Sequence, residues 1–159
     1  MTSFSHTYGL SYTLSYACNN YGPRQDVEKM IPRMLHAIFH QEKLPIYGKG
    51  EERRSWLFVE DHVEAIWQIV TRGPAKEHYL IGGGVECSNL ELVYFLIELL
   101  AKRGIVDFQE VVKRISFVEN RLGHDFRYAV DNSKIEKELG WKPKTSFAEG
   151  LVKTVEWYQ

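Results

Sequence analysis

Cysteine, an excess of one charge and long apolar runs are all scarce in this sequence. Two cysteines, Cys18 and Cys87, are too few for a disulfide framework, so we expect a reducing, cytoplasmic setting. Lys and Arg total 20 against 21 Asp and Glu, and without a basic excess we expect no nucleic-acid partner. The most apolar stretch, Leu92 to Ala101, is about half as long as a membrane-spanning helix must be, and the N-terminus lacks the features of a signal peptide. We therefore expect an ordinary soluble protein without a membrane partner.

Several motifs of common catalytic sites are also missing. The sequence has no Walker sequence, G-x-S-x-G or H-E-x-x-H, and its only partial match to G-x-G-x-x-G, Gly48-Lys49-Gly50, has Arg53 in place of the third glycine and is interpreted as a turn. The glycines Gly82 to Gly84 follow a strand, where they either bring the backbone close to a ligand or form a flexible strand-to-helix connection. His36 and His40 share one face of a helix but have no evident third ligand, so we expect no metal site. Cys18 has no base assigned to it and is interpreted as a small, semi-buried residue.

Alternating strands and helices predict an α/β fold. Short apolar and aromatic runs predict strands over 12–17, 44–47, 54–59, 78–81, 115–118 and 128–130, and residues 18–28 are expected to form a loop. Helical spacing predicts helices over 29–41 and 60–72, the second of which is apolar at Val63, Ile66, Trp67 and Val70. Three S-x-x-E capping boxes, at Ser88, Ser133 and Ser146, predict helices near 89–103, 134–139 and 147–158.

Loops at the predicted strand ends carry polar groups that suit a diphosphate. Asn19 and Asn20 have amides that donate to phosphate or sugar oxygens, and the planar guanidinium groups of Arg54 and Arg121 donate in pairs. The aromatic candidates for stacking on a base are Tyr21, Tyr47 and Trp56. Each feature also has a purely structural interpretation: the arginines as solvated surface residues, the asparagines as turn formers, and His124-Asp125 as a local hydrogen-bonded pair.

Taken in order, the motifs resemble the C-terminal half of the dTDP-glucose 4,6-dehydratase family of extended short-chain dehydrogenases/reductases. The resemblance covers nearly the whole chain, and its most specific segments are Cys18-Asn19-Asn20-Tyr21-Gly22-Pro23, Leu44-Pro45-Ile46-Tyr47-Gly48-Lys49-Gly50, Arg54-Ser55-Trp56-Leu57-Phe58-Val59-Glu60-Asp61-His62 and Arg121-Leu122-Gly123-His124-Asp125-Phe126-Arg127-Tyr128-Ala129.

The resemblance implies an α/β fold that is the substrate-binding part of such an enzyme, without most of the N-terminal Rossmann domain. Enzymes of this family are lyases that use NAD to convert dTDP-glucose into dTDP-4-keto-6-deoxyglucose, on the route to rhamnose and other deoxysugars. His6 to Leu10 matches the stretch just after the family's Tyr-x-x-x-Lys helix. We therefore expect no catalytic residue and no NAD binding in this chain, which is expected to be inactive alone. Residues 1–159 would form a single nucleotide-sugar-binding domain, with 1–28 a remnant strand and loop of the Rossmann half and 29–159 the substrate-binding portion.

Carried over position by position, the resemblance implies a binding site for a dTDP-sugar. Its expected members are Asn19 near the phosphates, Lys29 and Met30 on a loop over the nucleotide, Pro45 and Tyr47 beside the thymine, Arg54, Arg121 and His124 on the diphosphate, and Tyr158 near the substrate. Three positions depart from the family pattern: Leu80 replaces an Asn that we expect on the phosphate side, Ser55 replaces an Asp, and Leu122 replaces a Pro.

Two other interpretations remain open at this stage. The chain is also compatible with a non-catalytic nucleotide-sugar-binding or assembly module, and with a fragment of a UDP-sugar epimerase-like enzyme. An apolar face without its covering half, and an unprotected edge on the strand near Tyr12, would both promote association. We therefore expect a homo-oligomer, or a partner chain that carries the N-terminal half.

Overall fold

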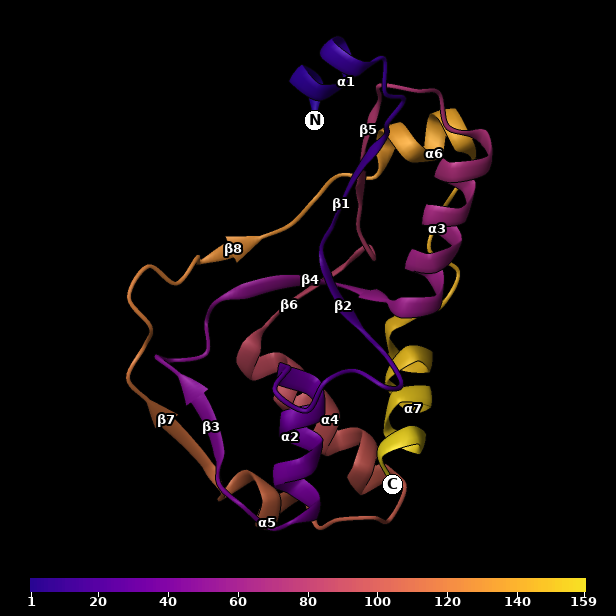
Figure 1. Cartoon of the computed structure of the whole chain (residues 1–159). Coiled ribbons are helices and arrows are strands. Elements are labelled where there is room, and N and C mark those ends of the chain that lie inside the picture. Colours follow the sequence, from indigo (N-terminus) through magenta and orange to yellow (C-terminus); the bar gives the residue numbers. More distant parts are fainter.

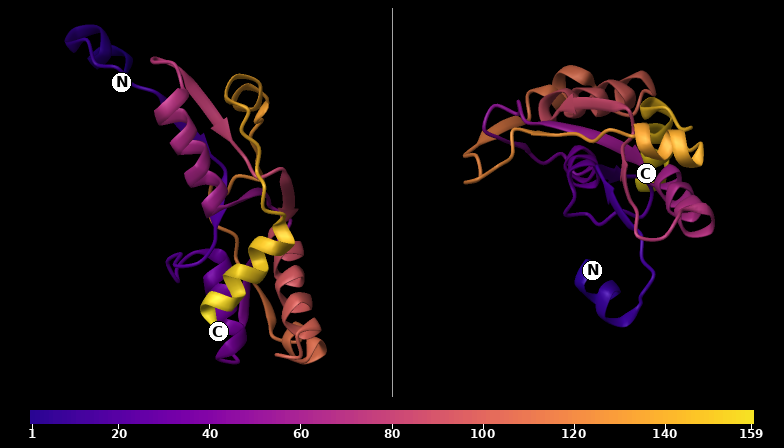
Figure 2. Two further views of the ribbon diagram at one scale, coloured as in Figure 1. Left: turned by 90° about the vertical axis from the view of Figure 1, so that its right-hand side faces the viewer. Right: turned by 90° about the horizontal axis from the view of Figure 1, so that it is seen from above.

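Three small sheets and seven helices form an elongated α/β structure, described by a computed structural model of residues 1–159 (Figure 1). The helices are α1 (Thr2–Tyr8), α2 (Met30–Phe39), α3 (Val59–Arg72), α4 (Asn89–Lys102), α5 (Phe108–Val112), α6 (Ser133–Leu139) and α7 (Phe147–Tyr158). The strands are β1 (Leu14–Ala17), β2 (Asn19–Tyr21), β3 (Leu44–Tyr47), β4 (Arg53–Phe58), β5 (His78–Ile81), β6 (Val85–Ser88), β7 (Ile115–Val118) and β8 (Arg127–Tyr128). None of these helices is both long enough and apolar enough to cross a membrane. The N-terminal α1 projects away from the other elements (Figure 2).

Strand β4 lies at the centre of the largest sheet. It pairs in parallel with β2, antiparallel with β6, and in parallel with β8 at its first two residues. The other sheets are two-stranded and parallel: β1 pairs with β5, and β3 pairs with β7. Chain segments that are far apart in sequence therefore converge at the start of β4.

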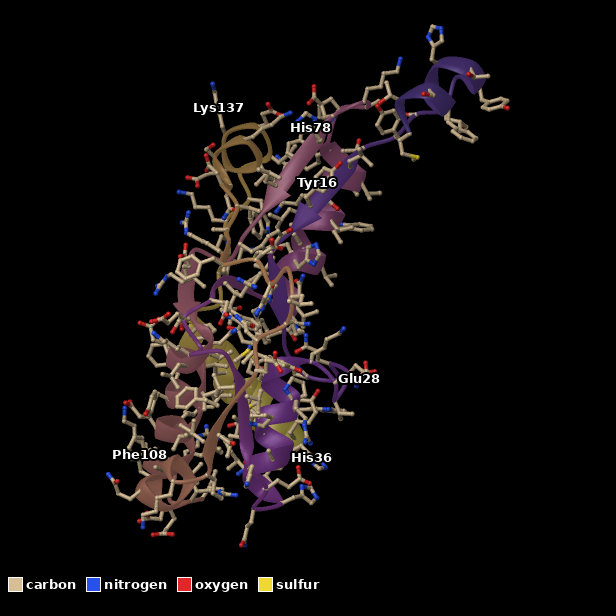
Figure 3. The ribbon with its side chains drawn as sticks, turned by 90° about the vertical axis from the view of Figure 1, so that its left-hand side faces the viewer. Tyr16, Glu28, His36, His78, Phe108 and Lys137 are labelled. Atoms are coloured by element: carbon tan, nitrogen blue, oxygen red, sulfur yellow. The ribbon has the colours of Figure 1, made fainter.

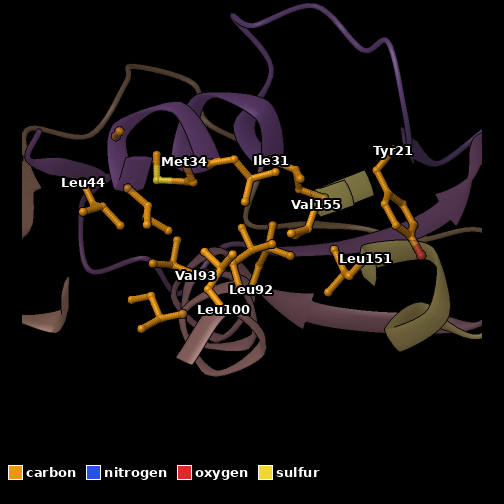
Figure 4. Packing of buried hydrophobic residues seen from close by; sticks show 14 of the residues in the cluster. Tyr21, Ile31, Met34, Leu44, Leu92, Val93, Leu100, Leu151 and Val155 are labelled. Atoms are coloured by element: carbon orange, nitrogen blue, oxygen red, sulfur yellow. The ribbon is translucent and has the colours of Figure 1, made fainter. Parts of the chain in front are cut away.

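Two hydrophobic cores lie on either side of β4. In the first, α2 packs Ile31 and Met34 against α4 and α7 (Figure 4). In the second, α3, β5 and α6 enclose Tyr79 and Trp141. Because successive side chains of a strand point to opposite faces, β4 supplies Trp56 and Phe58 to the first core and Leu57 to the second.

Local sequence signals explain why α2, α4 and α7 begin where they do. Pro32 is tolerated in the first turn of α2 because the backbone N–H that it lacks has no helical partner there. Both Ser88 and Ser146 form the predicted capping boxes: the Ser88 hydroxyl accepts from the Glu91 backbone N–H at 3.1 Å, and Glu91 accepts from the Ser88 backbone N–H at 2.7 Å. These three helices therefore start at the residues that the sequence predicts, to within one position.

The prediction of a loop over 18–28 was wrong at its start. Residues Asn19 to Tyr21 form β2, because their backbone pairs with Trp56 to Phe58 of β4. The third capping box was also wrong: Asn132, not Ser133, is the N-cap of α6. The Asn132 side chain caps nothing there, because its amide bonds the backbone N–H and carbonyl of Gly82 at 2.5 and 2.7 Å. Helices α1 and α5 and strand β6 were not predicted, and the strand expected over 128–130 is instead the two-residue strand β8, Arg127–Tyr128.

The glycines Gly82 to Gly84 connect β5 to strand β6 rather than to a helix. A Cβ atom on Gly83 would lie 1.6 Å from the Trp56 carbonyl oxygen, so this glycine is needed for a close approach to β4 and not to a ligand.

Candidate functional site

The expected site residues converge on one cavity of about 730 Å³ between the start of β4, α2, the end of β3 and the loop after β7. It is lined by Asn19, Val27, Glu28, Lys29, Met30, Arg33, Met34, His36, Pro45, Ile46, Tyr47, Arg54, Asn89, Arg121 and His124. Figure 3 labels two of them, Glu28 in the loop before α2 and His36 on the helix itself. All of the expected substrate-binding residues except Tyr158 are in this lining.

The polar side of the cavity suits an anion. Four cationic side chains, Lys29, Arg33, Arg54 and Arg121, line it together with the amides of Asn19 and Asn89. Lys29 also stands at the N-terminal end of α2, where the helix dipole favours negative charge. The carboxylate of Glu28 is the one negatively charged group in the lining. The donors outnumber the single carboxylate, so the cavity favours a ligand with more than one negative charge.

Arg54 connects the cavity to the loop after β7. Its Nη1 donates to the Arg53 carbonyl at 2.8 Å, and its Nη2 donates to the Asp125 carbonyl at 2.7 Å. The guanidinium therefore fixes the loop over the first residues of β4. The neighbouring Arg53 side chain bonds Glu86 instead, at 2.9 Å, and does not line the cavity. Adjacent arginines of β4 thus have different roles, as the alternation of a strand requires.

Aromatic and cationic groups meet where the cavity borders β3. The Arg121 guanidinium lies 5.1 Å from the centre of the Tyr47 ring, a cation–π contact, and the His124 ring stands edge-on to Tyr47 at 6.4 Å. His124 bonds Asn120 and Arg121 rather than Asp125, so a local His124-Asp125 pair is not formed. Pro45 and Ile46 complete an apolar wall beside Tyr47 that suits the flat face of a base.

Two of the three aromatic residues considered for stacking are not available to a ligand. Tyr21 and Trp56 are buried and pack edge-to-face with ring centres 6.2 Å apart. Burial raises the pKa of the Tyr21 hydroxyl, which donates to the Phe147 carbonyl. The sequence did not reveal this because neither residue was assigned to a strand face that packs on α7.

Tyr158 lies outside the cavity lining and contacts the segment that precedes α2. Its hydroxyl donates to the Gln25 carbonyl, and the Gln25 amide donates to the Asn20 carbonyl at 2.8 Å. These bonds brace the segment that leads into Lys29 and Met30. Asn20 likewise does not line the cavity, because its amide donates to the Cys18 carbonyl at 3.1 Å.

The departures from the family pattern lie away from the cavity. Leu80 pairs with Tyr16 in the β1–β5 ribbon and does not line the cavity, so this replacement removes no amide from the cavity lining. Asn19 and Asn89 supply the amides there instead. Ser55 is buried in β4, and Leu122 is fully exposed in its loop.

Neither cysteine nor the histidine pair supplies a reactive group. Cys18 and Cys87 are buried free thiols; burial raises the pKa of both, that of Cys87 to about 11, so neither is a ready nucleophile. The rings of His36 and His40 stack with centres 4.0 Å apart, and no group of three or more potential metal ligands gathers anywhere in the chain.

Sequence reasoning missed two cavity residues of the right chemistry, Arg33 and Asn89. Arg33 stands four residues after Lys29, which places both on one side of α2. Asn89 directly follows the capping residue Ser88 at the start of α4. The helical spacing and the capping box could have predicted both positions, but they were applied only to find where the helices begin and end.

The comparisons with known proteins agree with this architecture. The model of the GDP-mannose 4,6 dehydratase family matches residues 1–154. A dTDP-glucose 4,6-dehydratase of Escherichia coli is 45% identical over 157 residues, which are 98% of this chain and 43% of that relative. A crystal structure of a dTDP-glucose 4,6-dehydratase from Streptomyces venezuelae with NAD and TYD bound is 41% identical, with a TM-score of 0.90, over 98% of this chain and 46% of that one.

A UDP-glucose 4-epimerase from Thermotoga maritima, solved with UDP-glucose, is 29% identical with a TM-score of 0.86 over 99% of this chain and 48% of that one. The chain therefore spans less than half the length of the relatives it matches. The resemblance to the dehydratases and the expected fold, a part of an extended short-chain dehydrogenase/reductase, are confirmed.

Proposed function

The chain belongs to the GDP-mannose 4,6 dehydratase family, and from this premise we propose that it is the nucleotide-sugar-binding part of a dTDP-glucose 4,6-dehydratase. The observation that carries the proposal is the convergence of Asn19, Lys29, Tyr47, Arg54 and Arg121 on one cavity. These residues come from five separate segments of the chain, and the fold brings them together. The enzyme as a whole would convert dTDP-glucose into dTDP-4-keto-6-deoxyglucose.

In the proposed complex, the diphosphate lies among the cationic groups and the thymine lies against the apolar wall. Arg54 and Arg121 approach the cavity from different segments, so each guanidinium can donate a pair of hydrogen bonds to a different phosphate. His124 stands beside Arg121, with its Nε2 3.3 Å from Nη2 of that guanidinium. Pro45 and Tyr47 flank the base, and Lys29 and Met30 approach from the start of α2.

The residues of this chain do not fit NAD, the cofactor bound in the Streptomyces venezuelae relative. A dinucleotide needs glycines that open the backbone at a strand-to-helix turn. The turn at Gly48 and Gly50 leads into strand β4, and a Cβ on Gly50 would meet Ile46 and Leu90 at 2.7 and 2.9 Å, so protein atoms already fill that space. The space at Gly83 is filled by Trp56 in the same way. We assign no hydride-transfer step to these residues, and we propose that the chain by itself binds a dTDP-sugar without converting it.

Calorimetric titration of the chain with dTDP, UDP and NAD⁺ tests the proposal. We expect dTDP to bind, UDP to bind more weakly, and NAD⁺ not to bind. Formation of a 4-keto sugar from dTDP-glucose by the chain alone would contradict the proposal that this chain binds a dTDP-sugar without converting it. Preference for UDP over dTDP would favour an epimerase-like enzyme, for which the likeness to the Thermotoga maritima structure is the supporting observation.

We also propose that this chain associates, either with a second copy or with a chain that carries the N-terminal half. Four apolar side chains of α3, Val63, Ile66, Trp67 and Val70, are 40–72% exposed. Strand β1 pairs only with β5, so its other edge has free backbone donors and acceptors. An assembly that only binds or scaffolds would use the same surfaces. Light scattering that gives a mass of 18.6 kDa at all concentrations would contradict self-association.

The domain division and the location in the cell remain parts of this proposal. Residues 1–159 are taken as a single nucleotide-sugar-binding domain, and residues 1–28 as the edge of the Rossmann half; the pairing of β1 with β5 ties that edge to the rest. A cytoplasmic location is supported by the two buried cysteines, which are free thiols. Limited proteolysis tests the division, since separate units would be released as stable fragments.

A further inference from the structure

One buried acid, Glu52, contacts two residues that line the cavity, Asn89 and His124, but does not line it itself. Glu52 is 6% exposed. Its backbone carbonyl accepts from the Asn89 backbone N–H at 3.0 Å, and its side-chain Oε1 accepts from the Asn120 amide at 2.6 Å. The same Oε1 lies 3.5 Å from Nδ1 of His124. The other oxygen, Oε2, is buried without a hydrogen-bond partner, which costs folding free energy and is a feature that calls for an explanation.

The ionised form of Glu52 determines how the Asn120 amide is turned. Burial by itself favours the neutral acid, but hydrogen bonds from the backbone and from Asn120, with the charges of His124 and Arg54, outweigh it and lower the pKa. A carboxylate only accepts, so the NH₂ group of Asn120 must face Glu52. The Asn120 Oδ1 atom then faces the other way and accepts from the Arg121 backbone N–H at 2.9 Å.

That orientation in turn sets the protonation of the His124 ring. Nδ1 of His124 lies 2.8 Å from Asn120 Oδ1, an acceptor, so Nδ1 must carry a hydrogen. In the neutral ring Nε2 is then an acceptor, and it faces Nη2 of Arg121 at 3.3 Å. With the opposite tautomer, two donors would face one another. The turn at Gly48 packs closely on this group, because a Cβ there would lie 3.1 Å from the Asn120 amide nitrogen.

We propose that Glu52 is a positioning residue that holds the Arg121 guanidinium in the cavity, through Asn120 and His124, ready for a nucleoside diphosphate. The inference rests on the proposed function for its ligand, whereas its geometry is independent of any ligand. Glu52 sets the amide, the amide sets the imidazole tautomer, and the imidazole accepts from Arg121 while Tyr47 lies beneath the same guanidinium.

The test is ¹⁵N NMR of the imidazole rings in the full chain at pH ~8.5, where an ordinary histidine is neutral. In the wild type, the His124 signal, identified by its loss in His124→Asn, should report the Nδ1–H tautomer. Glu52→Met, which has similar length and no acceptor, should give mixed tautomers and bind dTDP roughly tenfold more weakly in calorimetry. Glu52→Gln keeps an acceptor and should stay within roughly threefold of the wild type. Glu51→Met is the matched control, because it removes the same charge at an exposed neighbouring residue and should change neither measurement.

Each outcome decides the inference. The Nε2–H tautomer in the wild type overturns it, even if no variant folds. A folded Glu52→Met protein with wild-type tautomer and affinity overturns it as well, and so does Glu51→Met if it has the same effect as Glu52→Met. A wild type that shows the Nδ1–H tautomer and its loss in Glu52→Met, but binds no dTDP, contradicts the proposed function and leaves the positioning of Arg121 supported.

Discussion

Replacing Arg54 by lysine should weaken binding of dTDP while leaving the fold intact. The guanidinium uses two nitrogens at once, Nη1 on the Arg53 carbonyl at 2.8 Å and Nη2 on the Asp125 carbonyl at 2.7 Å. A lysine keeps the positive charge, but its three donors sit on one nitrogen that cannot occupy both Nη positions, so we expect it to keep one of these bonds and lose the other. The loop that presents Arg121 and His124 to the cavity would then lose its connection to the start of β4.

The size of the effect follows from the bond that is lost. A hydrogen bond to a charged group contributes about 1.5–3 kcal/mol, and we take about 2 kcal/mol because Arg54 is only partly buried. Since each 1.4 kcal/mol corresponds to a factor of ten, dTDP should bind roughly 30-fold more weakly. The change in charge is zero, so long-range attraction of the diphosphate should not differ between the two proteins.

Calorimetric titration with dTDP measures this effect, and Arg53→Lys is the matched control. Arg53 is the adjacent residue of β4, but its side chain bonds Glu86 and is absent from the cavity lining. Arg53→Lys should therefore bind dTDP as the wild type does. The reasoning is refuted if Arg54→Lys binds within about threefold of the wild type, or if Arg53→Lys is weakened to the same degree.

Three further predictions concern stability and association. Hydrogen bonds from Arg127 and Arg53 lower the pKa of Glu86 from 4.5 to about 2. The ionised carboxylate therefore stabilises the fold fully above pH 4.5, and this stabilisation is lost as the pH falls toward 2, so the difference in Tm between the wild type and Glu86→Gln should disappear over that interval. A difference in Tm that stays constant with pH would contradict the ion pairing. Gly150→Ala places a Cβ 2.3 Å from the Tyr21 hydroxyl oxygen and should lower the free energy of unfolding in urea by about 1–3 kcal/mol. Equal stability would show that α7 or Tyr21 shifts to make room for the methyl group. Trp67→Glu, at a side chain that is 66% exposed, should weaken self-association in sedimentation experiments without lowering Tm, and unchanged association would exclude α3 as the contact.

Elements with a strong local signal were predictable from the sequence. The strand Leu44–Tyr47 was predicted at its observed bounds, and the capping serines Ser88 and Ser146 located the starts of α4 and α7. Strand β2 was missed because its residues, Asn19 to Tyr21, look like a turn and become a strand only by pairing with β4. The Ser133 capping box failed for a similar reason, since Asn132 is drawn to Gly82, 50 residues away. Such long-range contacts have no local signature.

The candidate site was predictable in its chemistry but not in its geometry. The amide of Asn19, the two arginines and Tyr47 were selected by residue type and by their place at strand ends, and all four line the cavity. Tyr21 was also selected but is buried, because the sequence does not say which face of β2 packs on α7. Glu52 was not considered at all, since a charged residue after a Gly-Lys-Gly turn is ordinarily solvated. Only the packing of the loop after β7 makes it a buried acid.

Strand β4 has a consequence for how the chain unfolds. Trp56 and Phe58 belong to one core and Leu57 to the other, so unfolding of this strand removes side chains from both cores at once. The two cores should therefore melt in a single cooperative transition, with the slowest amide hydrogen exchange in β4. Arg54 and the cavity lie at the start of the same strand. A ligand bound there stabilises the native state by mass action and should raise the melting temperature of both cores together. The melting of the second core, which contains Trp141, should therefore show whether the cavity on the other side of the strand is occupied.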